Sequence, residues 1–324
     1  MHTSLQSAFQ VERIQAIGFT VANADRSVDF YMKALGFETI SDVTSDITEG
    51  QTNSLEKSFD TKIRSVTLKL GDEQIRLMQY LDAEGKPIPP DSQSNDLWFQ
   101  HLAIVVSDMD CAYAHLQSFS IESISTSPQT IPPENKDAAY IQAFKFKDPD
   151  RHPLELIWFP PGKGQKKWHA KSDRLFLGID HTAIAIANTD QSLQFYRDLL
   201  GIQVDGGSFN WRETQARMDG LPDAMVKITA LRPSQGGLGI ELLDYVQPAD
   251  GRPMPSDLKQ DNIAYVQVEL IVSDINQAVN LLQLSNIQIV SSNTVQLGDR
   301  SSAPGYLIKD PTGHALVLLP ESTP

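Results

Sequence analysis

The chain of 324 residues is long enough for two domains with full cores, and its 40% apolar and 21% charged residues are typical of globular proteins. Its formal net charge of −14 argues against nucleic acid or an anionic membrane as a partner. Cys111 is the only cysteine, which excludes an internal disulfide, and we see neither a leader segment nor a bilayer-spanning apolar run, so we expect a cytoplasmic protein.

The N-terminal half predicts two successive sets of strand, helix and further strands. The elements predicted for the first set are a strand at 14–21, a helix at 25–35, and strands at 63–70 and 73–80. Those predicted for the second set are a strand at 101–106, a helix at 108–119, and strands at 141–147 and 154–159. Each set therefore has the order of a βαβββ unit.

Residues 161–175 are rich in proline, glycine and lysine, which predicts a linker. The linker separates an N-terminal domain, 1–160, from a C-terminal domain, 176–324. Trp168 and His169 lie within it. They either dock the linker onto a domain or line a site.

The C-terminal half opens with the clearest of the units. His181 starts the alternating segment HTAIAI, which predicts a half-buried strand. Asn188 offers an N-cap for the helix that follows, apolar residues recur in this helix at a period near 3.6, and Gly201 offers a C-cap. The third unit runs over about 178–246 and the fourth over about 266–320.

The four units are copies of one pattern. The segment IGFTVANADRSVDFYMKALGF, from Ile17, overlays TAIAIANTDQSLQFYRDLLGI, from Thr182. The segment KDPDRHPLELIWFP, from Lys147, overlays KDPTGHALVLLP, from Lys309. First and third units therefore correspond, as do second and fourth.

Four βαβββ units with an FYxxxLG helix end and a DPxGHxLEL-like last hairpin resemble the vicinal oxygen chelate superfamily. That superfamily includes glyoxalase I, methylmalonyl-CoA epimerase, extradiol ring-cleaving dioxygenases, and fosfomycin and bleomycin resistance proteins. The resemblance implies an α+β fold, in which the four units form two glyoxalase-like domains with curved, partly open mixed sheets. It does not by itself imply a substrate, because this fold supports many chemistries.

The resemblance also implies two metal-ligand positions in each unit, one early in the first strand and one in the last strand. The second and third units have ligand-type residues at these positions, namely His101, Glu155, His181 and Glu241. The first and fourth units have Ala16, Arg76, Gln267 and Val317 there. Glu155 and Glu241 interrupt otherwise apolar strands, where a lone buried carboxylate is unfavourable unless a cation or hydrogen-bond donors compensate it.

The pairing of the units decides whether these four residues meet. If each half pairs its own units, each half has an incomplete set. If the second unit pairs with the third, and the first with the fourth, all four residues converge on one site. We expect the second arrangement, as in single-chain, four-unit glyoxalases, because it accounts for the separation of retained and lost ligands.

Two imidazoles and two carboxylates suit a divalent metal such as Zn, Ni, Co, Mn or Fe. We therefore expect a metal-dependent lyase or isomerase of the glyoxalase type, acting by proton transfer next to a carbonyl of a small oxygenated substrate, as a monomer or homodimer. By the resemblance, Glu155 is the first candidate for the base and Glu241 the second.

Two alternatives remain open. One is an Fe(II) extradiol ring-cleaving dioxygenase, whose site would contain two histidines and one carboxylate. The other is a metal-free protein that binds small molecules, as in the resistance members. Ala185 stands where glyoxalase I commonly has an arginine for the glutathione carboxylate, which argues against a glutathione substrate.

Two further groups of residues have expected roles outside this ligand set. His152 and His314, which match across the repeat, are expected to be structural residues of the last hairpins. Residues 206–228 are expected to form a loop over the pocket, in which Arg212 or Arg217 either meets an acidic substrate or is solvated.

Overall fold

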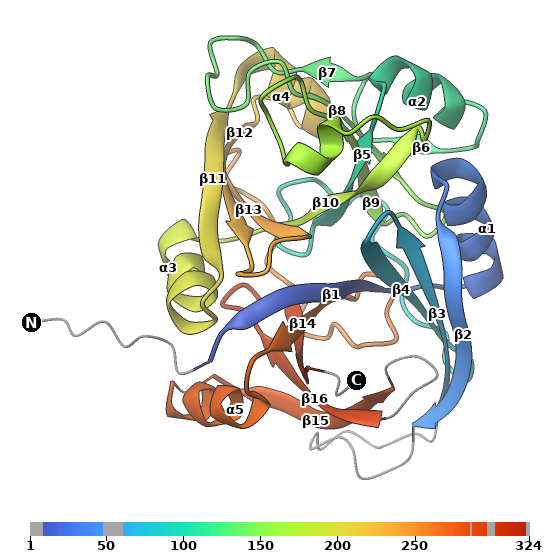
Figure 1. The fold of residues 1–324 in the computed structure, drawn as a ribbon, viewed down its shortest axis with the longest axis vertical. Coiled ribbons are helices and arrows are strands. Elements are labelled where there is room, and N and C mark those ends of the chain that lie inside the picture. Colours follow the sequence, from blue (N-terminus) through green and yellow to red (C-terminus); the bar gives the residue numbers. More distant parts are fainter. Residues whose placement is uncertain (1–8, 48–60, 286, 297–301, 322–324) are drawn as a thin grey trace, which may run out of the picture.

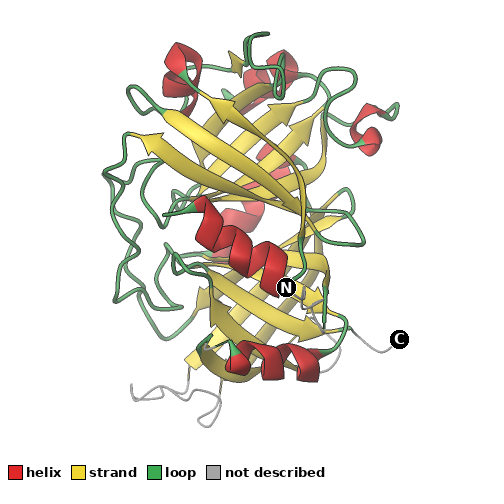
Figure 2. Cartoon of the chain, turned by 90° about the vertical axis from the view of Figure 1, so that its left-hand side faces the viewer, coloured by secondary structure: helices red, strands yellow, loops and turns green. Residues whose placement is uncertain are grey.

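The computed structural model describes residues 9–47, 61–285, 287–296 and 302–321. The outermost residues of the two predicted domains, 1–8 and 322–324, lie outside the described residues. The fold is α+β with two mixed sheets that do not close into barrels, which confirms the predicted class (Figure 1). Figure 2 shows the sheets one above the other, with helices between them.

One sheet is formed by the first and fourth units. In the described residues it has eight strands, in the order β15-β16-β17-β14-β1-β4-β3-β2. Their bounds are Val11–Thr20 for β1, Glu38–Ile47 for β2, Thr61–Leu70 for β3, Glu73–Tyr80 for β4, Val266–Val272 for β14, Ile289–Gln296 for β15, Ser302–Lys309 for β16 and Ala315–Pro320 for β17. The units join where β1 pairs antiparallel with β14.

The other sheet is formed by the second and third units. Its main path in the described residues is β11-β12-β13-β10-β5-β9-β8-β6, and β7 pairs with β8 beside it. The bounds are Gln100–Val106 for β5, Glu122–Ser123 for β6, Gln129–Thr130 for β7, Pro153–Trp158 for β9, Gln142–Lys147 for β8, Phe176–Ala185 for β10, Gln203–Asn210 for β11, Met225–Arg232 for β12 and Gly239–Gln247 for β13. The antiparallel pairing of β10 with β5 joins the two units, so the expected pairing across the halves is confirmed.

The bounds of the helices are Ala24–Leu35 for α1, Met109–Leu116 for α2, Lys166–His169 for η1, Thr189–Leu193 for α3, Arg212–Asp219 for α4 and Ile275–Leu284 for α5. Asn or Asp side chains cap the N-termini of four helices, α1, α2, α3 and α5. The Asn188 side chain accepts a hydrogen bond from the Gln191 N–H at 2.9 Å, which starts α3. A π-helical stretch, η2 (Gln194–Leu199), continues α3. Gly201 follows with φ of 73°, a left-handed value that suits glycine at a helix end.

The expected loop at 206–228 is wrong. This stretch contains the end of β11, the whole of α4 and the start of β12. Gly206 and Gly207 hid the strand, because glycines inside a strand pattern usually indicate a turn or a bulge. β11 does carry a register shift between Val204 and Gly206, so the glycines mark a bulge within a strand.

Two repeated tyrosines link the sheets. The hydroxyl of Tyr31, in α1, donates to Asp148 Oδ2 at 3.2 Å, and that of Tyr196, in η2, donates to Asp310 Oδ2 at 3.1 Å. Asp148 and Asp310 start the turns before β9 and β17. Each bond therefore joins a helix of one unit to the turn of the next unit, which lies in the other sheet. This explains why the FY and Asp-Pro positions recur together.

His152 and His314 brace the same turns, as predicted. His152 Nδ1 lies 3.0 Å from Asp148 Oδ2 and its Nε2 lies 2.8 Å from the carbonyl oxygen of Ile263. His314 Nε2 lies 2.8 Å from the carbonyl oxygen of Ala185. Both rings are buried. They are therefore structural residues of the hairpins.

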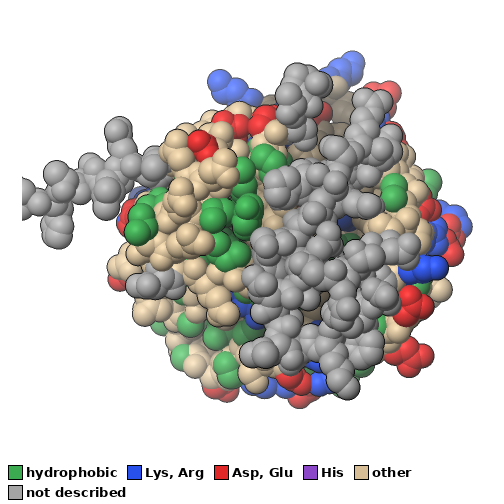
Figure 3. Space-filling view, turned by 90° about the horizontal axis from the view of Figure 1, so that it is seen from below, with side chains coloured by type: hydrophobic (Ala, Val, Ile, Leu, Met, Phe, Trp, Pro, Cys, Tyr) green, Lys and Arg blue, Asp and Glu red, His purple; other side chains and the backbone are tan. Residues whose placement is uncertain are grey.

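Charged side chains of both signs are mixed on the surface. On the face seen from below, side chains of both charges lie around the rim, and hydrophobic side chains gather left of the centre (Figure 3). Among the described residues, no helix has the length and apolar composition needed to cross a membrane.

Candidate metal centre

Four neighbouring strands present the predicted ligands on one face of the second sheet. His101 lies on β5 and His181 on β10, and the register pairs Ala183 with His101 and Ala103 with His181. Ala103 also pairs with Glu155 on β9, and Ala183 with Glu241 on β13. Cross-strand and diagonal neighbours on one face lie within side-chain reach. Pairing of the second and third units is therefore what brings the histidines and glutamates together.

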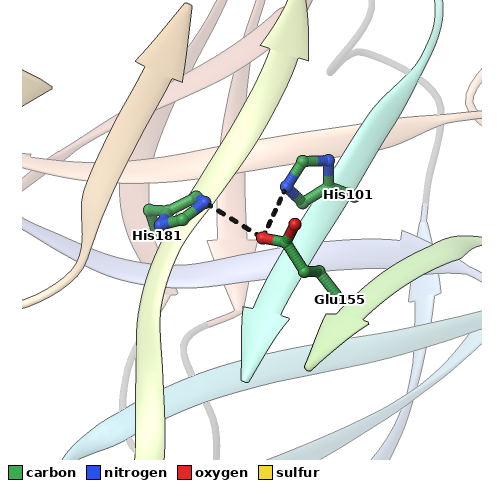
Figure 4. A group of neighbouring side chains, drawn as sticks. All are labelled: His101, Glu155 and His181. Atoms are coloured by element: carbon green, nitrogen blue, oxygen red, sulfur yellow. Dashed lines mark ion pairs between the residues drawn. The ribbon is translucent and has the colours of Figure 1, made fainter. Parts of the chain in front are cut away.

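Three of the four side chains converge closely (Figure 4). The Oε2 atom of Glu155 lies 3.3 Å from His101 Nε2 and 3.7 Å from His181 Nε2. Ligand atoms of these three buried residues all lie within 4.8 Å of one another, so they form a cluster that could hold a metal ion. Glu241 stands at the edge of the cluster, with Oε2 3.4 Å from His181 Nε2 and with 24% of its side chain exposed.

The surroundings give the four groups different protonation states. Burial lowers the pKa of His101 to about 4, although Glu155 opposes the shift. Burial acts in the same direction on His181, but Glu241 and Asp180 outweigh it and raise its pKa to about 9. Burial would raise the pKa of Glu155, but His101 and Lys145 hold it well below its usual range. Burial raises the pKa of Glu241, although the neighbouring His181 opposes the shift.

Asp180 fixes the orientation of His181. Its Oδ2 lies 3.1 Å from His181 Nδ1, and its Oδ1 accepts hydrogen bonds from Trp168 Nε1 at 2.8 Å and Gln165 Nε2 at 3.0 Å. A carboxylate at Nδ1 leaves Nε2 to face the cluster, an arrangement common behind metal-binding histidines. Trp168 thus docks the linker through a residue that supports the site. His169, in contrast, is exposed.

A bulge makes this contact possible. The pairing of β10 with β5 shifts register between Ile179 and His181, at Asp180. Adjacent residues in a regular strand point to opposite faces, so a regular strand would direct Asp180 away from His181. Sequence reasoning missed Asp180 for this reason. The first unit has the same shift between Ile14 and Ala16, the corresponding positions of β1.

The buried nitrogens of the cluster fit a metal. Within the described residues, three buried ring nitrogens make no hydrogen bond, namely Nδ1 and Nε2 of His101 and Nε2 of His181. Buried polar atoms rarely lack hydrogen bonds, so the two Nε2 atoms that face one carboxylate without bonding to it require an explanation. The donor set of two imidazoles and one or two carboxylates is that of Zn²⁺ and similar ions, and therefore supplies one.

The cluster opens into a cavity of about 750 Å³. Its walls include β11, β12 and α4, the region expected to be a loop. The residues that line it include the four predicted ligands and also Lys145, Asn210, Met218 and Tyr245. Arg212 and Arg217 are not among these lining residues. Arg217 pairs with Glu213 on the surface, 2.7 Å away, as expected for a solvated arginine.

In the first sheet, Arg76 stands at one of the corresponding positions and forms a buried ion pair with Glu269, which is two residues beyond Gln267. Arg76 on β4 donates two hydrogen bonds to Glu269 on β14, at 2.8 and 3.0 Å, and Gln267 Nε2 lies 3.3 Å from the same carboxylate. Both charged side chains are buried. Ala16 and Val317 complete the set, as predicted. Among the described residues, the one group of His, Cys, Asp and Glu side chains that could hold a metal ion lies in the second sheet.

Comparison with known proteins identifies the family. Residues 13–156 and 178–318 match the family model of the Glyoxalase/Bleomycin resistance protein/Dioxygenase superfamily. These ranges make up more than half of the chain, which therefore belongs to this superfamily. The two matched ranges correspond to the two halves of the internal repeat. No curated protein matches the chain closely enough to be reported as a relative.

Solved structures share the fold at low identity. Glyoxalase I from Zea mays has 14% identity and a TM-score of 0.63, with 95% of this chain and 92% of that chain covered. A Bacillus subtilis protein named as a candidate dioxygenase has 12% identity and a TM-score of 0.55, with 97% and 86% covered. At these identities the likeness shows the fold. The superfamily includes enzymes, and the reaction of this chain has to be argued from its own site.

Proposed function

We propose that this protein is a metal-dependent lyase or isomerase of the glyoxalase type, which moves a proton on a carbon next to a carbonyl of a small oxygenated substrate. The observation that carries the proposal is the set of His101, Glu155, His181 and Glu241 in the lining of a cavity of about 750 Å³. A cavity of this volume suits a small molecule. The two Nε2 atoms lie near carboxylates but make no hydrogen bond, which is the reason for including a metal.

In this proposal His101, Glu155 and His181 hold the metal. Glu155 is buried between both histidines and stays ionised, as a ligand must. When bound, the metal would act as a Lewis acid that polarises the carbonyl and acidifies the neighbouring C–H bond.

We assign the proton transfer to Glu241, which reverses the order expected from the resemblance. Glu241 lies at the edge of the cluster and is partly exposed, whereas Glu155 is enclosed by the histidines. Its pKa is raised by burial, which makes its carboxylate a stronger base than an ordinary glutamate. It would accept the proton from one carbon and return it to a neighbouring position.

The first experiment is elemental analysis of purified protein and of two histidine variants. We expect about one equivalent of metal in the wild type, loss of the metal in His181→Ala, and retention in His115→Ala, which removes a histidine of helix α2 that does not line the cavity. A wild type that binds no metal even after loading would refute the lyase proposal and favour a metal-free binding protein. If metal binds, carbonyl substrates are screened next.

One observation favours a second candidate function. The compact cluster has two histidines and one carboxylate, His101, His181 and Glu155, and Glu241 stands outside it. This is the donor set of non-haem Fe(II) oxygenases, and it leaves room for substrate and oxygen. Oxygen uptake by Fe(II)-loaded protein with catechols would support a ring-cleaving dioxygenase. Isomerisation without oxygen uptake would support the lyase or isomerase.

A further inference from the structure

A buried lysine lies beside the candidate metal centre. Lys145 is on β8, directly opposite Glu155 on β9 in the antiparallel register. It is 3% exposed and lines the cavity. An ammonium group is costly to bury, so its position next to the cluster requires a reason beyond packing.

Asp219 holds the lysine in place. Lys145 Nζ lies 2.6 Å from Asp219 Oδ1, and both side chains are buried. The other oxygen of Asp219 accepts hydrogen bonds from Gln215 Nε2 at 2.6 Å and Tyr245 Oη at 2.9 Å. Asp219 ends α4, so its position is set by a helix as well as by these two donors. The ammonium group is therefore fixed rather than free to turn into solvent.

The ammonium group retains donors for a ligand. It has three N–H bonds, and in the described residues Asp219 supplies its one hydrogen-bond acceptor. The remaining N–H bonds belong to a group that lines the cavity. A carboxylate or an ionised hydroxyl in the cavity would satisfy them through charge-assisted hydrogen bonds.

We propose that Lys145 binds an anionic oxygen of the substrate, and that the substrate is therefore an anion with a carboxylate or ionised hydroxyl next to the carbonyl. This inference rests on the proposed function, because it places the substrate between the metal and Lys145. The proposal also agrees with Ala185 on β10, where glyoxalase I commonly has an anion-binding arginine, because Lys145 on β8 would bind the anion instead.

The test uses oxalate, a dianion with vicinal oxygens, and imidazole, a neutral metal ligand. Both are titrated by calorimetry into metal-loaded protein, and oxalate also into chelator-treated protein. The test variant is Lys145→Met with Asp219→Asn, which removes the ammonium group without leaving a buried carboxylate unpaired. The control is Lys163→Met. Lys163 also lines the cavity, but its Nζ donates to the carbonyl oxygens of Lys136 and Asp137, both at 2.7 Å.

We expect the double variant to bind oxalate about 10- to 100-fold more weakly than the wild type, as for the loss of a charge-assisted hydrogen bond. Lys145 also lowers the pKa of Glu155, so metal content is measured for each variant and oxalate is titrated into fully loaded protein. Imidazole affinity should change much less than oxalate affinity, and Lys163→Met should bind oxalate like the wild type. If the double variant does not fold, Lys145→Gln is compared instead, because it retains a donor for Asp219.

The outcomes separate this inference from the proposed function. Oxalate affinity that is independent of Lys145, in loaded and in metal-free protein, would overturn the inference. So would an equal loss of imidazole affinity, which would indicate a damaged metal site. Absence of metal from the wild type would refute the proposed function, and the titration of metal-free protein would still decide whether Lys145 binds the anion.

Discussion

Asp180 offers a sharp test of how the metal centre is built. The change is Asp180→Asn, which preserves shape and removes the negative charge beside His181. The carboxylate now accepts from His181 Nδ1 with one oxygen and from Trp168 and Gln165 with the other. An asparagine has one oxygen, so its amide NH₂ must face either the histidine or the linker residues. One of the two hydrogen-bonded sides is therefore lost.

The expected effect is a drop in metal affinity of about 10- to 100-fold, the usual effect of losing the carboxylate behind a metal-binding histidine. The drop corresponds to about 1.4 to 2.8 kcal/mol of binding free energy. Affinity is measured by competition with a chromophoric chelator. The pH should lie above the pKa of His181, about 9, because there the ring is neutral in both proteins and proton competition does not mask the loss.

The matched control is Asp137→Asn. Asp137 also lines the cavity, but it is exposed and lies in the loop between β7 and β8. We expect its metal affinity to stay within about twofold of the wild type, as for the loss of an exposed charge. If Asp180→Asn binds metal as tightly as this control, the proposed support of His181 by Asp180 is refuted.

Three further predictions follow from the same geometry. Glu155→Gln should lose the metal. Glu241→Gln should retain the metal and turn over substrate about 10²- to 10⁴-fold more slowly. Equal metal loss in both variants would contradict the assigned roles. A metal ion that binds His181 must displace its proton, so the apparent metal affinity should rise about tenfold per pH unit up to the pKa of His181, about 9, and then level off. The affinity is measured by chelator competition. A profile that does not change with pH would argue against His181 as a ligand. Tyr196→Phe removes a buried hydrogen-bond donor to Asp310 and should lower the free energy of unfolding by about 1.5 to 3 kcal/mol. Urea titration measures this change. An unchanged urea midpoint would mean that this hydrogen bond does not hold the sheets together.

The repeated pattern was enough to predict most of the fold. The predicted strand 73–80 has the bounds of β4, and the other elements of the first two units agree within a few residues. The unequal distribution of His and Glu among the units predicted which units pair. Equivalent positions of the units have the same structural role, so each unit supports the prediction made for its copies.

Contacts between distant or irregular segments were harder to predict. Asp180 needs a bulge to reach the same side as His181, and alternation alone places adjacent residues on opposite faces. Lys145 had a usable signal, because alternation along β8 and the following hairpin put it opposite Glu155. No sequence signal indicated its partner Asp219, which ends α4. Gly206 and Gly207 led to the prediction of a loop over this region, so α4 was not predicted.

The ion pair between Arg76 and Glu269 has a consequence for how this protein can change over generations. In a two-fold homodimer of half-length chains, both clefts would be encoded by the same codons, and any substitution would appear in both. Joining the halves in one chain removes this symmetry. In one chain, the first sheet can hold an internal ion pair while the second sheet holds His101, Glu155, His181 and Glu241. Substitutions in the first sheet can therefore be selected without changing the candidate metal centre.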